Sequence, residues 1–77
     1  MIMVEIIKKE YDERDNEIYH KFSDGFEEWC EYDENGNMIY YKDSDGYEYW
    51  KEYDERGNEI HYKNSKGFEV WYNNIIS

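Results

Sequence analysis

The chain has 77 residues and a net charge of −11, with 20 acidic residues, 21% aromatic residues, one cysteine and no proline. This length allows one domain with a thin core, and the single Cys30 excludes an internal disulfide. High acidity indicates disorder when aromatic residues are few, but here ten tyrosines and three tryptophans recur at regular places and favour a folded chain.

The N-terminal residues 1–7 are apolar apart from Glu5, and two lysines follow at once. This run is much shorter than the roughly 20 apolar residues of a membrane-spanning helix, and it lacks the form of a secretory signal. We therefore expect a partial repeat with a strand at 3–9. We also expect a cytoplasmic protein, where one free cysteine stays reduced.

From residue 10 onward one unit of 21 residues occurs three times, at 10–30, 31–51 and 52–72. Each copy opens on Glu-Tyr-Asp-Glu, and residues 73–77 break the pattern and are expected to cap the array. The positions that keep their residue type are Lys21, Lys42 and Lys63; Ser23, Ser44 and Ser65; Gly25, Gly46 and Gly67; Trp29, Trp50 and Trp71.

Two turn signals divide each unit. Asn35-Gly36 lies between apolar runs and predicts a hairpin, because both residues tolerate positive φ. Asp15 stands in place of this glycine in the first copy, which predicts a looser turn there. The second signal, at 23–25, 44–46 and 65–67, ends in glycine and is typical of a type I turn followed by a glycine bulge.

The segments between the turns have the length of strands, and none has the apolar spacing of a helix. The sequence predicts a single all-β domain over residues 1–77, an antiparallel meander of about seven short strands. They are expected near 3–11, 17–22, 26–32, 38–43, 47–53, 59–64 and 68–73.

A loop at 44–46 sets the register of its hairpin and pairs opposite charges and aromatic rings. The expected pairs are Asp43 with Tyr47, Lys42 with Glu48, Tyr41 with Tyr49, Tyr40 with Trp50, Lys21 with Glu27 and Lys63 with Glu69. Alternation then places Tyr32, Ile39, Tyr41, Tyr49 and Tyr53 on one face. The other face carries Trp29, Met38, Tyr40 and Trp50, with Glu31, Lys42, Glu48 and Glu52 among them.

The phrase Glu-Tyr-Asp-Glu-Asn-Gly-Asn at 31–37, followed by a strand and Asp45-Gly46, resembles the YD repeats of the Rhs family. The resemblance covers residues 10–72 and implies β-hairpin ribbons. Rhs repeats build large toxin-encapsulating shells, which three units are too few to form. The single-layer hairpins of MORN repeats are a more distant likeness.

The acidic turns are the first candidate site. One interpretation is solubility, a charged fringe that keeps a flat sheet from aggregating. The other is a phosphate-like array, spaced about 9.5–10 Å between equivalent turns, that occupies a basic nucleic-acid groove on another protein. The candidate carboxylates are Asp12, Glu13, Asp33, Glu34, Asp54 and Glu55 on one edge, and Asp43, Asp45 and Asp24 on the other.

The aromatic residues are the second candidate site. Aromatic residues in strands are usually packing residues, but 77 residues cannot bury both faces of one layer. One face is therefore expected to meet a second copy, to curl on itself or to meet a partner. The candidate residues are Trp29, Tyr40, Tyr41, Tyr49, Trp50 and Trp71.

No motif predicts catalysis or a cofactor. The turn at 43–46 is similar to a fragment of a calcium loop, but no glutamate closes it at the required spacing. His20 and His61 have no second ligand at metal spacing, and Cys30 has no oriented base, so we assign all three to packing or surface roles.

The sequence thus favours a non-enzymatic acidic module that binds a protein, with neither nucleic acid nor membrane as a direct ligand. Its short, acidic profile is similar to that of phage anti-CRISPR and anti-restriction inhibitors, which occupy nucleic-acid-binding surfaces. The alternative is a structural repeat protein that associates with itself, for example as a homodimer, with its charge serving solubility. The sequence names neither the partner nor the face that is covered.

Overall fold

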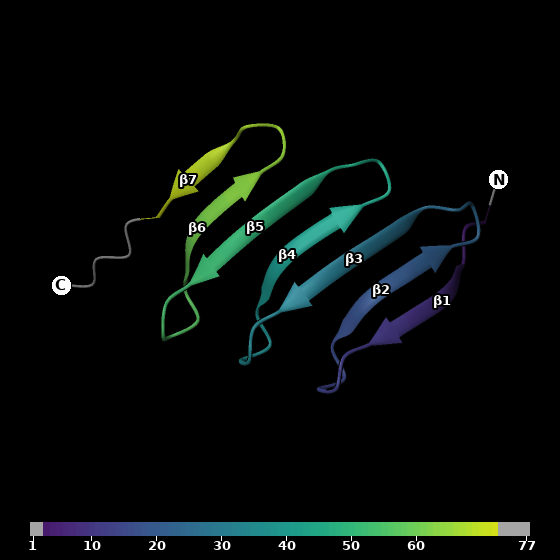
Figure 1. Cartoon of the computed structure of the whole chain (residues 1–77), viewed down its shortest axis with the longest axis horizontal. Coiled ribbons are helices and arrows are strands. Elements are labelled where there is room, and N and C mark those ends of the chain that lie inside the picture. The colour runs from purple at the N-terminus through teal and green to yellow at the C-terminus, as the bar shows by residue number, and fades with distance from the viewer. Residues whose placement is uncertain (1–2, 73–77) are drawn as a thin grey trace.

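A computed structural model of the chain describes residues 3–72, so the expected cap at 73–77 lies outside the described residues. Its strands are β1 (Ile6–Tyr11), β2 (Glu17–Phe22), β3 (Glu27–Tyr32), β4 (Met38–Asp43), β5 (Glu48–Tyr53), β6 (Glu59–Asn64) and β7 (Glu69–Trp71). They pair in chain order as one antiparallel sheet (Figure 1). This confirms the all-β meander. β1 begins at Ile6 instead of residue 3, and β3, β5 and β7 each begin one residue later than predicted.

Both kinds of turn have the same backbone geometry. The amide of Asp33 donates to the Asn37 carbonyl at 2.8 Å, and the Gly36 amide donates to Asp33 at 3.0 Å. Asp43, Tyr47 and Gly46 repeat this pattern in the other turn type. Each is the type I turn with a glycine bulge that was predicted for one of them alone. The prediction allowed positive φ at both Asn35 and Gly36, but only Gly36 has it (84°). Within residues 3–72 the one non-glycine residue with positive φ is Asp15.

The turn that contains Asp15 is not looser than the others, contrary to the prediction. Asp15 adopts a φ of 65°, and its amide donates to the Asp12 carbonyl at 3.1 Å, as Gly36 does to Asp33. Aspartate reaches this left-handed region more readily than most residues. The first hairpin therefore keeps the shared geometry at some cost in backbone strain.

The repeated serines join neighbouring hairpins. The Ser44 hydroxyl accepts from the Glu27 amide at 3.0 Å, and the Ser44 amide donates to the Glu27 carbonyl at 2.9 Å. Ser65 and Glu48 form the same pair of bonds, and Ser23 bonds Glu5 in this way. This contact between successive units explains why serine recurs at the same position of each repeat.

The predicted cross-strand register is confirmed. Tyr40 faces Trp50, Tyr41 faces Tyr49, and Lys42 faces Glu48. The same register pairs Lys21 with Glu27 and Lys63 with Glu69.

A bulge that recurs at Ile18, Ile39 and Ile60 changes the face of a predicted residue. Tyr32 pairs with Met38 while Glu31 pairs with Tyr40, so Ile39 is the extra residue of the bulge. Met38 consequently lies beside Tyr41 and Tyr49, and its sulfur accepts from the Tyr49 hydroxyl at 3.3 Å. Placing Met38 on the face of Trp29 was therefore wrong, because strict alternation ignores the bulge.

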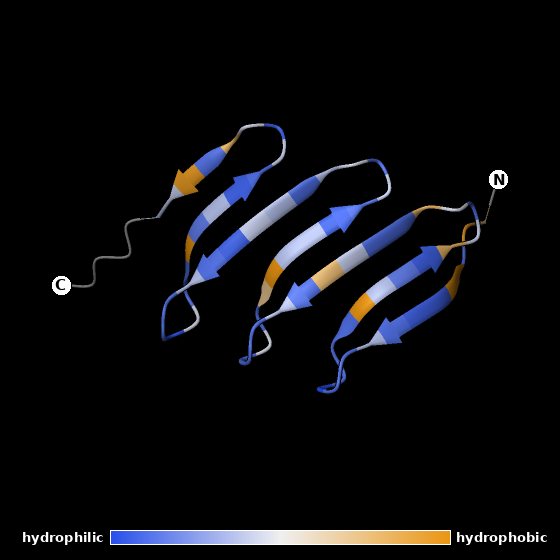
Figure 2. Cartoon of the chain, in the orientation of Figure 1, coloured by the Kyte–Doolittle hydropathy of each residue, from blue (hydrophilic) through white to orange (hydrophobic). Residues whose placement is uncertain are grey.

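The sheet is one layer without a core. Among residues 3–72 no hydrophobic side chain is buried, and the buried residues are Asp43 and His61. The sheet measures 51 × 31 × 20 Å, and apolar residues appear as isolated bands along the strands (Figure 2). No helix within residues 3–72 has the length and apolarity needed to cross a membrane. Both faces of the sheet are therefore available for contact.

Candidate functional site

One face of the sheet carries the three tryptophans, each paired with a ring on the preceding strand. Ring centroids are 5.5 Å apart for Tyr19 and Trp29, and 5.7 Å apart for Tyr40 and Trp50. His61 stacks on Trp71 at 3.7 Å. We call this surface, formed by Trp29, Trp50, Trp71, Tyr19, Tyr40 and His61, the tryptophan face. Equivalent rings lie two strands apart, so they repeat at about 9.5–10 Å.

In each pair, a glutamate contacts the ring that lies on the preceding strand. The Tyr40 hydroxyl donates to Glu48 at 2.5 Å, Tyr19 donates in the same way to Glu27, and His61 contacts Glu69 at 2.7 Å. The hydrogen bond to the carboxylate raises the pKa of Tyr19 and that of Tyr40 to about 12. Across residues 3–72 the ion pairs of lysine are Lys8 with Glu10 and Lys51 with Glu59, so the facing Lys42 and Glu48 do not form one.

The sequence prediction left out Tyr19, His61 and these glutamates as site residues. The 21-residue phase could have found Tyr19 and His61, since both occupy the position of Tyr40. The hydrogen bonds could not be found in this way, because the facing partner of each glutamate is a lysine.

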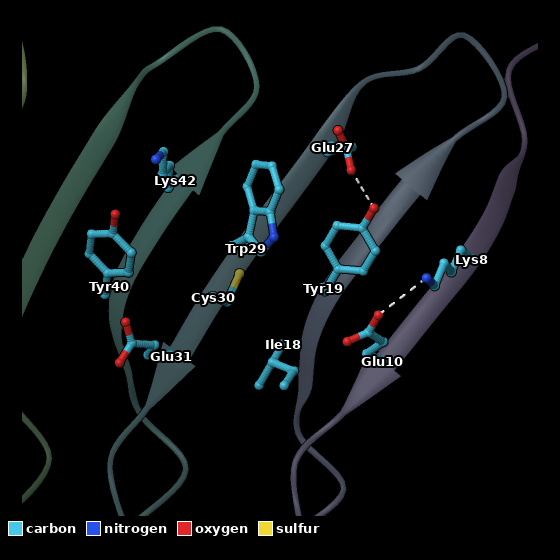
Figure 3. Close-up of a pocket in the computed structure, with 10 residues that line it drawn as sticks. All are labelled: Lys8, Glu10, Ile18, Tyr19, Glu27, Trp29, Cys30, Glu31, Tyr40 and Lys42. Carbon is cyan, nitrogen blue, oxygen red and sulfur yellow. Dashed lines mark hydrogen bonds and ion pairs between the residues drawn. The ribbon is translucent and has the colours of Figure 1, made fainter.

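A groove of about 580 Å³ lies on the tryptophan face. Figure 3 shows Trp29 on β3 between Tyr19 on β2 and the pair Tyr40 and Lys42 on β4. Glu31 lines the groove and is exposed, and Trp29 retains 36% of its surface exposed. The groove therefore offers an exposed tryptophan ring with a carboxylate beside it, a combination suited to a cationic side chain, although Lys8 and Lys42 also line it and Lys8 already lies over the Tyr19 ring at 5.9 Å.

The opposite face is a continuous layer of tyrosines. Tyr41 and Tyr49 stack with ring centroids 4.9 Å apart, and Tyr49 in turn contacts Tyr62 at 5.6 Å. Tyr47 contacts both Tyr41 and Tyr49. We call this surface, formed by Tyr41, Tyr47, Tyr49 and Tyr62 with Met38, the tyrosine face. The aromatic candidates thus divide: Tyr41 and Tyr49 lie here, and Trp29, Tyr40, Trp50 and Trp71 lie on the tryptophan face.

Glu28 connects the tyrosine face to His20. Its carboxylate accepts from the Tyr41 hydroxyl and contacts the His20 ring. Burial, followed by the hydrogen bond to Glu28, raises the pKa of Tyr41, and burial also raises the pKa of the Cys30 thiol nearby. A raised pKa keeps the thiol protonated, which lowers its nucleophilicity.

The first aspartate of each acidic turn is a structural residue. Asp33 Oδ1 accepts from the amides of Asn35 and Asn37 at 2.9 Å each, and Asp12 and Asp54 make the equivalent bonds. These backbone hydrogen bonds, first among them those from Asn16, Asn37 and Asn58, lower the pKa of Asp12, Asp33 and Asp54. These carboxylates stay charged but hold the turn.

Asp43 has the same capping role at the opposite edge. It is 8% exposed and accepts from the amides of Asp45 and Tyr47 and from the Tyr41 hydroxyl at 3.2 Å. The candidate carboxylates whose residues are exposed are Glu13, Asp24, Glu34, Asp45 and Glu55, and Asp24 also accepts from the Phe26 amide at 2.9 Å.

The excess charge is concentrated at the turns. Residues 12–16, 23–25, 33–37, 44–46, 54–58 and 65–67 contain nine acidic and three basic residues, so nine less three gives −6 of the total −11. Successive turns of one type follow each other along the same edge (Figure 1). The edge formed by the turns at 12–16, 33–37 and 54–58 carries −5 of this charge, and the opposite edge carries −1.

Within residues 3–72 no group of three or more histidine, cysteine, aspartate or glutamate side chains is arranged to hold a metal ion. Comparison with protein-family models, curated proteins and solved structures gives no match.

Proposed function

We propose that this chain is a non-enzymatic acidic binding module that occupies a basic, nucleic-acid-binding surface of a partner protein and so inhibits it. The observation that supports this most is the combination of a negative turn edge with an exposed tryptophan face on one sheet. The nucleic acid that such a partner binds is a regular row of negative phosphates, and the acidic turns would take the place of these phosphates. The module offers a negative charge of −5 along the edge of the Asp-Glu turns, with aromatic anchors beside it.

The two features have separate roles in the proposed complex. The exposed carboxylates Glu13, Glu34 and Glu55 attract a basic surface over distance and increase the rate of encounter. An arginine or lysine of the partner then lies over Trp29 or Trp50, with Glu31 or Glu52 beside the ring. Attraction depends on salt, and the aromatic contact depends on it much less.

Affinity capture from the native host, eluted with a salt gradient, tests this proposal. The immobilised full chain should retain a nucleic-acid-binding protein that elutes as salt rises. Duplex DNA or RNA should then compete with the module for that protein. Recovery of partners that bind no nucleic acid, or retention that salt does not change, contradicts the proposal, as does direct binding of nucleic acid to the module.

Matched variants separate attraction from anchoring. The triple change Glu13→Gln, Glu34→Gln and Glu55→Gln keeps the aspartate caps and should weaken binding and flatten its salt dependence. Trp50→Ala should weaken binding while leaving the salt dependence unchanged. Lys21→Gln, which adds to the net negative charge, is the control and should not weaken binding.

A further inference from the structure

The tyrosine face is uncovered although its polar groups are already satisfied within it. The Tyr47 and Tyr62 hydroxyls share a hydrogen bond of 2.9 Å, and Tyr53 donates to the Met38 carbonyl at 2.9 Å. Tyr41 donates to Glu28, its hydroxyl lies 3.2 Å from Asp43 Oδ2, and Tyr49 donates to Met38. Covering this face would therefore leave no hydroxyl of these tyrosines without a partner, which removes the main cost of burying polar side chains.

Several charges on the tyrosine face are paired, although Lys66 lies over the Tyr47 ring at 5.7 Å and forms no ion pair within residues 3–72. Lys51 forms an ion pair with Glu59 at 3.3 Å and lies over the Tyr49 ring at 5.4 Å. Glu28 contacts His20 as well as Tyr41. The tryptophan face differs, because Glu31 and Lys42 are exposed there and form no ion pair within residues 3–72. Of the two faces, the tyrosine face is thus the less costly to remove from water.

The chain exposes more surface than a compact monomer of its mass. Its accessible surface is 5982 Å², whereas a compact monomer of 9.7 kDa exposes about 5,100 Å². The difference, about 900 Å², is close to the roughly 800 Å² that each partner buries in a standard interface. Of the net charge of −11, −6 lies at the turns, at the periphery of the tyrosine face, and −5 lies elsewhere in the chain.

We propose that a second copy of this chain covers the tyrosine face. Two sheets pack with their tyrosine faces together around a two-fold axis, about 10 Å apart. The core that one layer lacks then forms between the two copies. Both tryptophan faces stay outward, so the dimer is independent of the proposed foreign partner and presents two copies of the surface that would bind it.

Neighbouring residues of β5 provide a matched test, since Tyr49 lies on the tyrosine face and Trp50 on the tryptophan face. Sedimentation of the full chain over a range of concentrations should give the mass of a dimer. Tyr49→Lys should shift the mass to that of a monomer, and Trp50→Lys should leave a dimer. Circular dichroism checks that each variant remains folded.

Cys30 gives a second measurement on the unmodified chain. It pairs with Tyr41 and lines the same surface as Tyr49 and Met38. Reaction of its thiol with a labelling reagent should be slow at high protein concentration and faster on dilution, as the dimer dissociates. If Tyr49→Lys does not fold, Tyr62→Lys replaces it.

A monomer at every concentration, with thiol reactivity independent of dilution, overturns the proposal. So does a dimer that dissociates with Trp50→Lys as readily as with Tyr49→Lys. Either result leaves the salt-dependent capture of a foreign partner to be decided by its own experiment.

Discussion

At the scale of the residue, Asp15 holds a backbone conformation that glycine holds in the sister turns. Its φ is 65°, against 84° for both Gly36 and Gly57. We expect Asp15→Gly to stabilise the fold by about 0.5–1 kcal/mol, because glycine adopts positive φ without steric cost and its unfolded-state entropy offsets part of the gain. For a domain of this size, that gain raises the melting temperature by about 2–8 °C, as scanning calorimetry can measure.

The reciprocal change is the control for this prediction. Gly36→Asp places the same side chain at the same turn position one repeat later, with open space around the added Cβ. It should lower the melting temperature by a similar amount. Equal melting temperatures of the unmodified chain, Asp15→Gly and Gly36→Asp would contradict the shared turn geometry.

Also at this scale, the Tyr40–Glu48 hydrogen bond predicts a specific alkaline titration. The pKa of Tyr40 is raised to about 12, so its contribution to stability is complete below the unfolded-state pKa of about 10. The contribution is lost as pH rises from about 10 to about 12. Glu48→Gln should return the pKa of Tyr40 toward 10, as NMR of labelled tyrosine rings can follow.

Glu52→Gln is the matched control, since Glu52 lies on the same strand and does not bond Tyr40. It should leave the titration of Tyr40 unchanged. A pKa of Tyr40 near 10 in the unmodified chain would contradict the hydrogen bond.

At the scale of the element, serine bonds link each hairpin to the next. Ser44→Ala removes the bond from the Glu27 amide at 3.0 Å and should destabilise the sheet by about 0.5–1 kcal/mol. Ser44→Thr keeps the hydroxyl and should lose less. Urea unfolding measures both, and an alanine variant as stable as the unmodified chain would show that the serine bond adds nothing.

Sequence reasoning predicts the elements well because the turns are local. Glycine at a fixed phase sets each loop, and the loop sets the register of Lys42 with Glu48 and Tyr40 with Trp50. The bulge at Ile39 was missed because strict alternation was assumed along each strand, although isoleucine occupies the bulge position in every repeat, at Ile18, Ile39 and Ile60. Met38 was consequently placed on the wrong face.

The candidate site was harder to predict than the fold. A charged side chain in the sequence does not reveal whether its oxygens are already used. Asp33 and Asp43 cap their turns, whereas Glu34 and Asp45 beside them stay exposed. Likewise, Glu48 faces Lys42 across the hairpin but accepts from Tyr40. Such choices depend on side-chain geometry in three dimensions, which residue type and spacing leave open.

At the scale of the whole molecule, the main feature is a sheet that buries no hydrophobic side chain within residues 3–72. Its aromatic residues divide between two faces, and its excess charge lies at the turns. The radius of gyration is 15.1 Å, while a compact chain of 77 residues has about 11.5 Å. The shape itself therefore distinguishes this account from any fold that closes around a core.

X-ray scattering with in-line mass measurement tests that shape most directly, and the Tyr49→Lys variant allows it to be applied to a single chain. The single-layer sheet predicts monomer mass with a radius of gyration near 15.1 Å. An unfolded variant would be recognised by a value of about 27 Å. Monomer mass with a value near 11.5 Å would contradict the account, because it would mean that the chain folds around a core of its own.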